Sequence, residues 1–144
     1  MGKLNITVEM EKQVKILAID DDPNIHTVVK KVFESKPYEV ISAFDGEEGL
    51  QKVVEEKPDL IILDVIMPGK SGFEICRELK THHKYHRFSE IPVLMLTVYP
   101  DDREKMHLSM REGMTMEAEE YLHKPFDPDE LLRMAERLLR KREI

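Results

Sequence analysis

The sequence predicts an α/β fold in which a five-stranded parallel sheet lies between two layers of helices. Short apolar runs alternate with amphipathic stretches along the chain, and the connections between them are short. The run at residues 60–63 is apolar at every position, which is typical of a strand buried on both faces of a parallel sheet. Since parallel neighbours require a crossover, which is usually a helix, five such strands imply helices on both sides.

Two pairs of a strand and a helix make up the first part of this fold. Val14–Ile19 is rich in β-branched residues and has the length of a strand, and Tyr38–Ala43 is predicted to be the second strand. The first helix begins at Pro23, with Asp22 as its N-cap. The apolar face of this helix consists of Ile25, Val28, Val29, Val32 and Phe33. A capping pattern at Asp45 starts the second helix. Its inward residues are expected to be Leu50, Val53 and Val54.

The rest of the chain continues the alternation. The remaining strands are expected at residues 60–63, 91–96 and 121–123. A turn at Pro68 leads into a helix whose apolar residues are Phe73, Ile75, Cys76 and Leu79. Residues 101–112 form a polar helix in this prediction. The final helix starts like the first one, with Asp127 as cap and Pro128 at the first helical position. Its apolar face consists of Leu131, Ala135, Leu138 and Leu139.

The composition is typical of a cytoplasmic single-domain protein. A length of 144 residues suits one domain, which we expect at residues 14–144 after an N-terminal extension at residues 1–13. The net charge of -7 disfavours direct contact with nucleic acid. The N-terminus contains no apolar run of the kind found in a membrane span or a secretion signal. The single cysteine, Cys76, cannot form an intramolecular disulfide, which fits a reducing compartment.

Polar residues stand at the ends of four predicted strands. They are Asp20 and Asp21 after the first strand, Asp64 after the third, Thr97 after the fourth and Lys124 after the fifth. In open α/β sheets, ligands bind in the crevice outside the carboxyl ends of the strands. We therefore expect a functional site in which three carboxylates, a hydroxyl and an ammonium group converge.

These residue types suit a cation site beside a phosphoryl site. Three carboxylates in one cleft repel one another unless a cation offsets their charge. Mg²⁺ is usually held by one or two carboxylates together with phosphate oxygens. A carboxylate can also act as the nucleophile that forms an aspartyl phosphate. With the metal and Lys124 neutralising the phosphoryl oxygens, positioning would supply most of the catalysis.

Four segments of the chain, in this order, resemble the receiver domain of two-component response regulators, which includes the chemotaxis regulators. These segments are ILAIDDDP, PDLIILDVIMPGKSGFE, IPVLMLT and YLHKPF, and the resemblance extends over residues 15–139. It implies the flavodoxin-like fold with strand order 2-1-3-4-5. It further implies a signalling switch rather than an enzyme, with Mg²⁺ as cofactor and a histidine kinase or a phosphotransfer protein as phosphoryl donor. The output would be a downstream protein or an output domain outside this sequence, and homodimerisation is a further option.

The resemblance also implies the roles of the carboxylates. Asp64 would be the residue that is phosphorylated. Mg²⁺ would be held by Asp20 and Asp21, directly or through water, by Asp64, and by the backbone carbonyl of Ile66.

Further roles follow from the resemblance for the last two strands. Thr97 would donate a hydrogen bond to one phosphoryl oxygen and Lys124 would pair with another, and the peptide bond between Lys124 and Pro125 would be cis. Tyr121 would turn inward as Thr97 is drawn to the phosphoryl group. This switch would alter the surface formed by the helix at residues 101–112, the fifth strand and the final helix.

Three positions depart from the family pattern. The residue after Thr97 is usually small but is Val98 here, which we expect to restrict access to Asp64. Ile66 and Tyr99 occupy two positions that could orient an attacking water, and both side chains do so poorly. We therefore expect hydrolysis of the phosphoryl group to be slow.

Other functions remain open on the residues alone. Phosphatases of the haloacid dehalogenase type use an aspartyl nucleophile as well, but normally carry a second aspartate where this chain has Ile66. A flavodoxin-type cofactor module would need a phosphate loop rich in Gly, Ser or Thr after the first strand, where three acids stand instead. A degenerate receiver could act only as a protein-interaction module, which the intact set of acids disfavours.

Two other polar groups have plainer explanations. Asp22 is expected to cap the first helix rather than to bind metal. A second group, which we expect to be solvated rather than metal-binding, consists of His82, His83 and His86.

Overall fold

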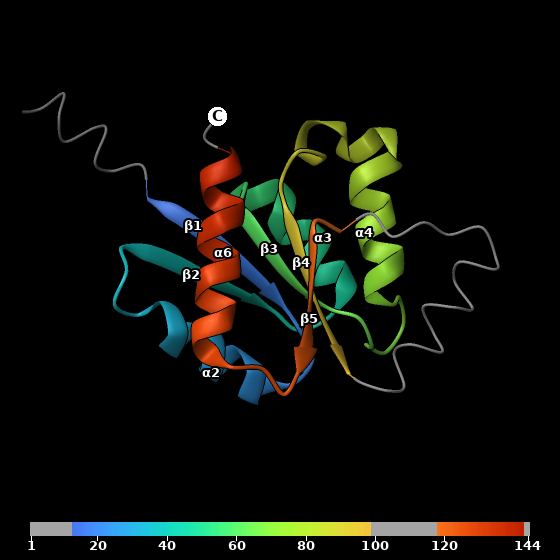
Figure 1. Cartoon of the computed structure of the whole chain (residues 1–144). Helices are drawn as coiled ribbons and strands as arrows, with labels where there is room; N and C mark the ends of the chain where they lie inside the picture. Colours follow the sequence, from blue (N-terminus) through green and yellow to red (C-terminus); the bar gives the residue numbers. More distant parts are fainter. Residues whose placement is uncertain (1–12, 99–117, 143–144) are drawn as a thin grey trace, which may run out of the picture.

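The computed structural model describes residues 13–98 and 118–142, which form one parallel sheet with helices on both faces (Figure 1). The strands lie in the order β2-β1-β3-β4-β5 and all neighbours pair in parallel. They are β1 (Val14–Ile19), β2 (Tyr38–Ala43), β3 (Leu60–Asp64), β4 (Val93–Val98) and β5 (Glu120–Lys124). The predicted α/β fold, and the strand order implied by the resemblance, are confirmed.

The helices form two layers. Among the described residues, α2 (Pro23–Phe33) and α6 (Pro128–Arg142) cover one face of the sheet, and α3 (Gly46–Glu56) and α4 (Gly72–Thr81) cover the other face. Side chains alternate along each strand, so Ile16 and Ile62 pack under α2 and α6 while Leu17 and Leu63 pack under α3 and α4. Every residue of β3 is buried, as predicted for a strand in the middle of a parallel sheet.

Carboxylates cap α2, α3 and α6 at the positions predicted from the sequence. Asp22 accepts a hydrogen bond from the N–H group of Asn24 at 2.9 Å, and Asp45 accepts one from the N–H group of Glu48 at 2.8 Å. Asp127 has the same position at the start of α6. These bonds satisfy N–H groups that have no partner inside the helix, so they set where each helix begins.

Two valines predicted to face inward are exposed. Val28 in α2 is 37% exposed and Val54 in α3 is 42% exposed. In α2 the buried residues are instead His26, Val29 and Phe33, which lie three and four positions apart on one face. The buried face of each helix is thus narrower than the apolar face predicted from the sequence, and Val28 and Val54 lie at the edge of that buried face.

β4 begins and ends two residues later than the predicted range 91–96. Pro92 has no N–H group and cannot donate to the sheet, although its carbonyl accepts a bond from Ile61 N–H at 3.0 Å. Paired register with β3 therefore starts at Val93. At the other end, pairing with β5 carries the strand to Val98, which pairs with Lys124.

One short element was not predicted. The 3-10 helix η1 (His83–Phe88) follows α4 and buries Tyr85 and Phe88 against the core under α3 and α4.

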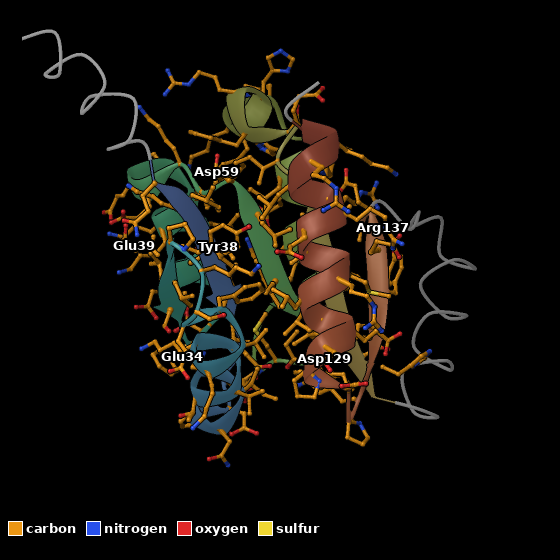
Figure 2. All side chains as sticks on the ribbon, turned by 60° about the vertical axis from the view of Figure 1, so that its left-hand side comes forward. Glu34, Tyr38, Glu39, Asp59, Asp129 and Arg137 are labelled. Atoms are coloured by element: carbon orange, nitrogen blue, oxygen red, sulfur yellow. The ribbon has the colours of Figure 1, made fainter. Side chains whose placement is uncertain are left out.

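The predicted helix at residues 101–112 lies outside the described residues. Arg137 of α6, which is labelled in Figure 2, pairs with Glu120 of β5 at 2.8 Å and so connects the last helix to the edge strand. Within the described part of the chain, no helix is long and apolar enough to cross a membrane.

Candidate functional site

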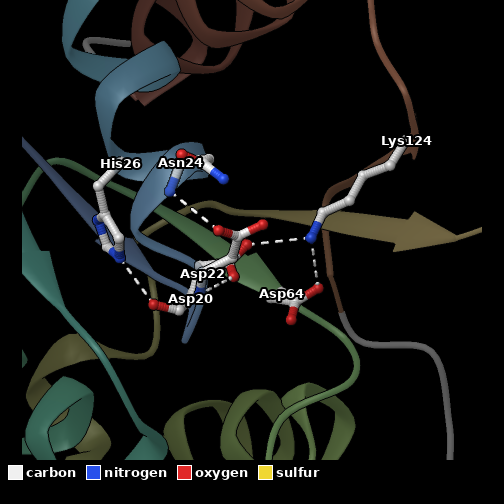
Figure 3. A network of polar contacts seen from close by, with 6 residues as sticks. All are labelled: Asp20, Asp22, Asn24, His26, Asp64 and Lys124. Carbon is white, nitrogen blue, oxygen red and sulfur yellow. Dashed lines mark hydrogen bonds and ion pairs between the residues drawn. The ribbon is translucent and has the colours of Figure 1, made fainter.

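The polar residues predicted at the strand ends meet at one edge of the sheet. Asp20 directly follows β1, Asp64 is the last residue of β3, and Lys124 is the last residue of β5 (Figure 3). Asp20, Asp64 and Thr97 are buried, and so is the apolar residue that precedes each of them. Buried carboxylates are costly unless charge or hydrogen bonds compensate them, so this edge is built around polar contacts rather than around packing.

Three carboxylates form a compact acidic cluster. Asp20, Asp21 and Asp64 each offer an oxygen, and these oxygens lie within 4.8 Å of one another. Asp21 is exposed while the other two are buried, so the cluster opens to solvent on one side. Carboxylate oxygens with a solvent-facing side suit a hard cation such as Mg²⁺, which keeps several of its waters. Asp22 is outside this cluster and caps α2.

Lys124 joins the two buried carboxylates. Its Nζ lies 3.0 Å from Asp64 Oδ1 and 3.1 Å from Asp20 Oδ2, so one ammonium group serves β1 and β3 from the end of β5 (Figure 3). Charge-assisted hydrogen bonds of this kind are stronger than neutral ones. The cluster therefore has one compensating positive charge in direct contact with it.

One positive charge does not offset the cluster completely. Burial, followed by the charge of Asp20, raises the pKa of Asp64 from its ordinary value of 3.8 to about 6, against the opposing effect of Lys124. For Lys124, burial alone would lower the pKa, but attraction to Asp20 and Asp64 outweighs burial and places its pKa above 10.5. The electrostatic balance thus favours an additional cation beside Asp64.

The residues expected to act around a phosphoryl group lie on β4 and β5. Thr97 Oγ1 is 3.0 Å from Nδ1 of His123, its register partner on β5. Tyr121 is partly buried against the core under α3 and α4. The peptide bond between Lys124 and Pro125 is cis.

The positions that depart from the family pattern are only partly described. Ile66 follows β3 and is exposed. Val98 is the last residue of β4, but its side chain lies outside the described residues, as does all of Tyr99. The expected restriction of access by Val98 therefore stays a prediction.

Two histidines near the site were not singled out by the sequence. His26 is buried in α2 and contacts the backbone of Asp20, and His123 contacts Thr97. His26 shares a helical face with Val29 and Phe33, and this spacing is the one sequence signal that could have found it. The group of histidines that follows α4 is exposed, as predicted. It consists of His82, His83 and His86.

Comparison with known proteins shows a family match over most of the chain. The family model of the response regulator receiver domain matches residues 16–136. The alkaline phosphatase synthesis transcriptional regulatory protein PhoP of Bacillus subtilis is 38% identical over 130 residues, which cover 90% of this chain and 50% of that protein. The chain thus spans about half the length of the curated relatives that it matches.

Solved structures give the same result for the fold. The chemotaxis protein CheY4 of Vibrio cholerae is 35% identical, with a TM-score of 0.69 over 88% of this chain and 98% of that one. A CheY-like receiver domain protein of Methanospirillum hungatei is 30% identical, with a TM-score of 0.74 over 92% of this chain and 98% of that one. With its matched sequence, its strand order and its acidic edge, this chain belongs to the response regulator receiver domain family of two-component signalling.

Proposed function

We propose that Asp64 accepts a phosphoryl group from a histidine kinase or a phosphotransfer protein in a Mg²⁺-dependent reaction. The observation that carries this proposal is the contact between Lys124 Nζ and Asp64 Oδ1 at 3.0 Å, inside a cluster of three carboxylates. A nucleophilic oxygen, a cationic partner for a phosphoryl oxygen and a set of metal ligands thus lie together. These are the groups that aspartyl phosphate formation needs.

The acidic cluster fits the metal that the family implies. Asp20, Asp21, Asp64 and the backbone carbonyl of Ile66 would hold Mg²⁺, since all of them offer hard oxygen ligands. The bound ion would neutralise charge on the phosphoryl oxygens. The raised pKa of Asp64 supports this assignment, because burial and repulsion from Asp20 together outweigh the attraction of Lys124, and a bound cation would offset them.

The transfer itself is a displacement at phosphorus. A carboxylate oxygen of Asp64 attacks the phosphorus atom, the bond to the donor histidine nitrogen breaks, and its electron pair remains on that nitrogen. Lys124 moves its contact from the Asp64 oxygen to a phosphoryl oxygen, and the hydroxyl of Thr97 donates a hydrogen bond to another. Positioning and charge neutralisation therefore account for the chemistry that these side chains perform.

The same reaction would operate a switch. Thr97 would leave its present partner His123 to reach the phosphoryl group, and Tyr121 would turn inward into the space beside it. The surface around β5 and α6 would change as a result. We propose that this surface signals to a downstream protein or to an output domain, as the double length of the curated relatives suggests, and that it does so in the cytoplasm.

The test is phosphorylation with acetyl phosphate, with and without Mg²⁺, followed by intact mass spectrometry. We expect one Mg²⁺-dependent phosphoryl adduct on the wild-type chain, none on Asp64→Asn, and an unchanged adduct on Asp129→Asn, which alters an exposed aspartate of α6. Light scattering with the phosphoryl mimic BeF₃⁻ would show whether the activated form dimerises.

Two results would contradict the proposal. If the wild-type chain takes up no adduct under any condition, it is a degenerate receiver that acts only through protein contacts. If it releases inorganic phosphate from phosphate esters with continuous turnover, it is an aspartyl phosphatase.

A further inference from the structure

His26 is a buried polar side chain that the proposed reaction does not use. It lies in the first turns of α2 and is 3% exposed. Its Nε2 is 2.7 Å from the backbone carbonyl oxygen of Asp20 (Figure 3). Because a carbonyl can only accept a hydrogen bond, Nε2 carries the proton and donates it. His26 therefore reaches from the helix back to the residue at which β1 ends.

Together with three other hydrogen bonds, this bond holds Asp20 in place. The N–H group of Asp20 donates to the carbonyl of Ala43 at 3.1 Å, and its Oδ1 accepts from the N–H group of Asp22 at 2.9 Å. Its Oδ2 accepts from Lys124 at 3.1 Å. With the bond from His26, each polar atom of Asp20 has a partner, and the contact from His26 is the one that holds its carbonyl.

An aromatic contact holds the His26 ring in place. The ring centroids of His26 and Phe44 lie 4.3 Å apart, at an interplanar angle of 45°. Phe44 is itself held by its N–H group, which donates to Glu48 Oε1 at 2.8 Å. Phe44 is 44% exposed while His26 is buried, so the phenyl ring lies on the outer side of the pair. Excluding water strengthens the bond from His26 to Asp20.

The held carbonyl controls the direction of the next residue. The carbonyl of Asp20 and the nitrogen and Cα of Asp21 lie in one peptide plane, because the peptide bond is planar. A bond that fixes the carbonyl thus also fixes how Asp21 leaves the strand. In this orientation of the turn, the oxygens of Asp20, Asp21 and Asp64 lie within 4.8 Å of one another, and a rotation of the turn would move the Asp21 carboxylate relative to the other two.

We infer that His26 is a positioning residue of the acidic cluster, which it aligns for Mg²⁺ through its hydrogen bond to the Asp20 carbonyl. This inference rests on the proposed function, since it names a residue that prepares the same site. Mg²⁺ demands near-ideal octahedral geometry, so its affinity is sensitive to small shifts of its carboxylate ligands. Groups that orient metal ligands without touching the metal typically change metal affinity by 10-fold or more.

A pair of amide variants tests the inference. The amide nitrogen of His26→Gln can reach about as far as Nε2 and can donate to the Asp20 carbonyl, whereas the shorter side chain of His26→Asn cannot. His26→Phe keeps a ring against Phe44 but has no donor. We expect the dissociation constant of Mg²⁺, measured by calorimetric titration of the full chain, to rise about 10-fold in His26→Asn and His26→Phe. In His26→Gln it should stay within about threefold of wild type.

Thermal unfolding of the metal-free variants separates positioning from stability. We expect His26→Gln and His26→Asn to have similar melting temperatures while their Mg²⁺ affinities differ. If His26→Phe does not fold, the two amide variants still decide the question. Equal Mg²⁺ affinity in both amide variants, beside normal binding by the wild type, overturns the role of His26. Absence of Mg²⁺ binding by the wild-type chain overturns the proposed function itself and the inference with it.

Discussion

At the level of single residues, the charges around Asp64 set its pKa and affect the stability of the fold. Asp64 is buried beside Asp20, and Lys124 is the cation that contacts both of them. Burial and like charge together raise the pKa of Asp64 to about 6 even though Lys124 opposes the shift. In the metal-free protein the ionised form of Asp64 is thus a source of instability, as we expect if the site binds the proposed cation.

The first prediction concerns pH and the metal-free protein. The pKa of Asp64 is about 6 when folded and 3.8 in its ordinary state, so between these values the folded form binds the additional proton. The free energy of unfolding should therefore fall as pH rises from about 4 to about 6, by about 3 kcal/mol at most for this group. Urea unfolding in EDTA, at several pH values, measures it.

The matched variant for this prediction is Asp64→Asn, which cannot ionise. It should be more stable than the wild-type chain above pH 6, and the difference should shrink towards pH 4. An advantage of the variant that is the same at every pH in this range would contradict the assigned pKa shift.

The second prediction concerns removal of the positive charge. Lys124→Met leaves Asp20 and Asp64 buried without their common partner, which should cost about 3 kcal/mol at pH 7.5 without metal. Lys36→Met is the control, because Lys36 pairs with Glu136 near the surface and should cost less than about 1 kcal/mol. Chemical denaturation gives both values, and equal losses in the two variants would refute the central role of the buried pair.

The third prediction concerns the lifetime of the phosphoryl group. Ile66 is exposed beside the site and has no polar atom in its side chain with which to orient a water molecule. Ile66→Asn should shorten the half-life of the phosphorylated form several-fold, which radiolabel decay would measure. Val98→Ala should instead speed up phosphorylation by acetyl phosphate. If neither rate changes, these two positions do not set the tempo of the switch.

At the level of the elements, the loop between β3 and α4 depends on one close approach. A Cβ atom added to Gly72 would lie 2.2 Å from the backbone oxygen of Asp64 and 2.9 Å from Cα of Val65. The N–H group of Gly72 also donates to the carbonyl of Val65 at 2.8 Å. The start of α4 therefore packs directly on the backbone that carries Asp64, the proposed phosphorylation site.

The fourth prediction compares two glycines of this loop. Gly72→Ala should cost about 3 kcal/mol, because backbone atoms must move, and should slow phosphorylation of Asp64. Gly69 has φ of 79° but no atom within 4 Å of its added Cβ, so Gly69→Ala should cost only about 1–2 kcal/mol through backbone strain. We expect Gly69→Ala to be phosphorylated at the normal rate, and equal defects in both variants would count against the steric explanation.

The bounds of a helix or strand were predicted correctly where they depend on residues close together in the sequence. The bounds of β1 and β2 agree with the apolar runs, and the caps at Asp22 and Asp45 agree with the start of α2 and α3. Pro92 shifted the start of β4 because pairing with β3 needs an N–H group that proline lacks. The helix η1 was not predicted, because its two buried aromatic residues within six positions do not form a clear helical or strand periodicity.

At the level of the whole molecule, metal binding and stability should be coupled. Mg²⁺ that binds the folded chain but not the unfolded chain stabilises the fold, by about 2.7 kcal/mol at 100 times the dissociation constant. The fifth prediction is that Mg²⁺ raises the melting temperature of the wild-type chain more at pH 7.5 than at pH 5, where the proton on Asp64 competes with the metal. Calorimetric melting with Mg²⁺ or EDTA tests it, and a larger effect at pH 5 would argue against Asp64 as a ligand.

The positions of the main site residues could be predicted because parallel topology brings strand ends together. Strands joined by right-handed crossovers all point the same way, so polar residues after β1, β3 and β5 must meet at one edge whatever the details of packing. Asp20, Asp64 and Lys124 needed no further information to be placed there.

The sequence by itself therefore determined the fold class, the family and the edge of the sheet that carries the acids. Only the tertiary structure decided which atoms touch: that Lys124 bridges two carboxylates, that His26 holds the Asp20 carbonyl, and that Val28 stays exposed. The physical reason is how far apart in the sequence the interacting residues lie. Apolar periodicity reports the local conformation of a segment, whereas contacts between residues far apart in the chain depend on register and helix orientation, and a shift of one residue would change every one of them.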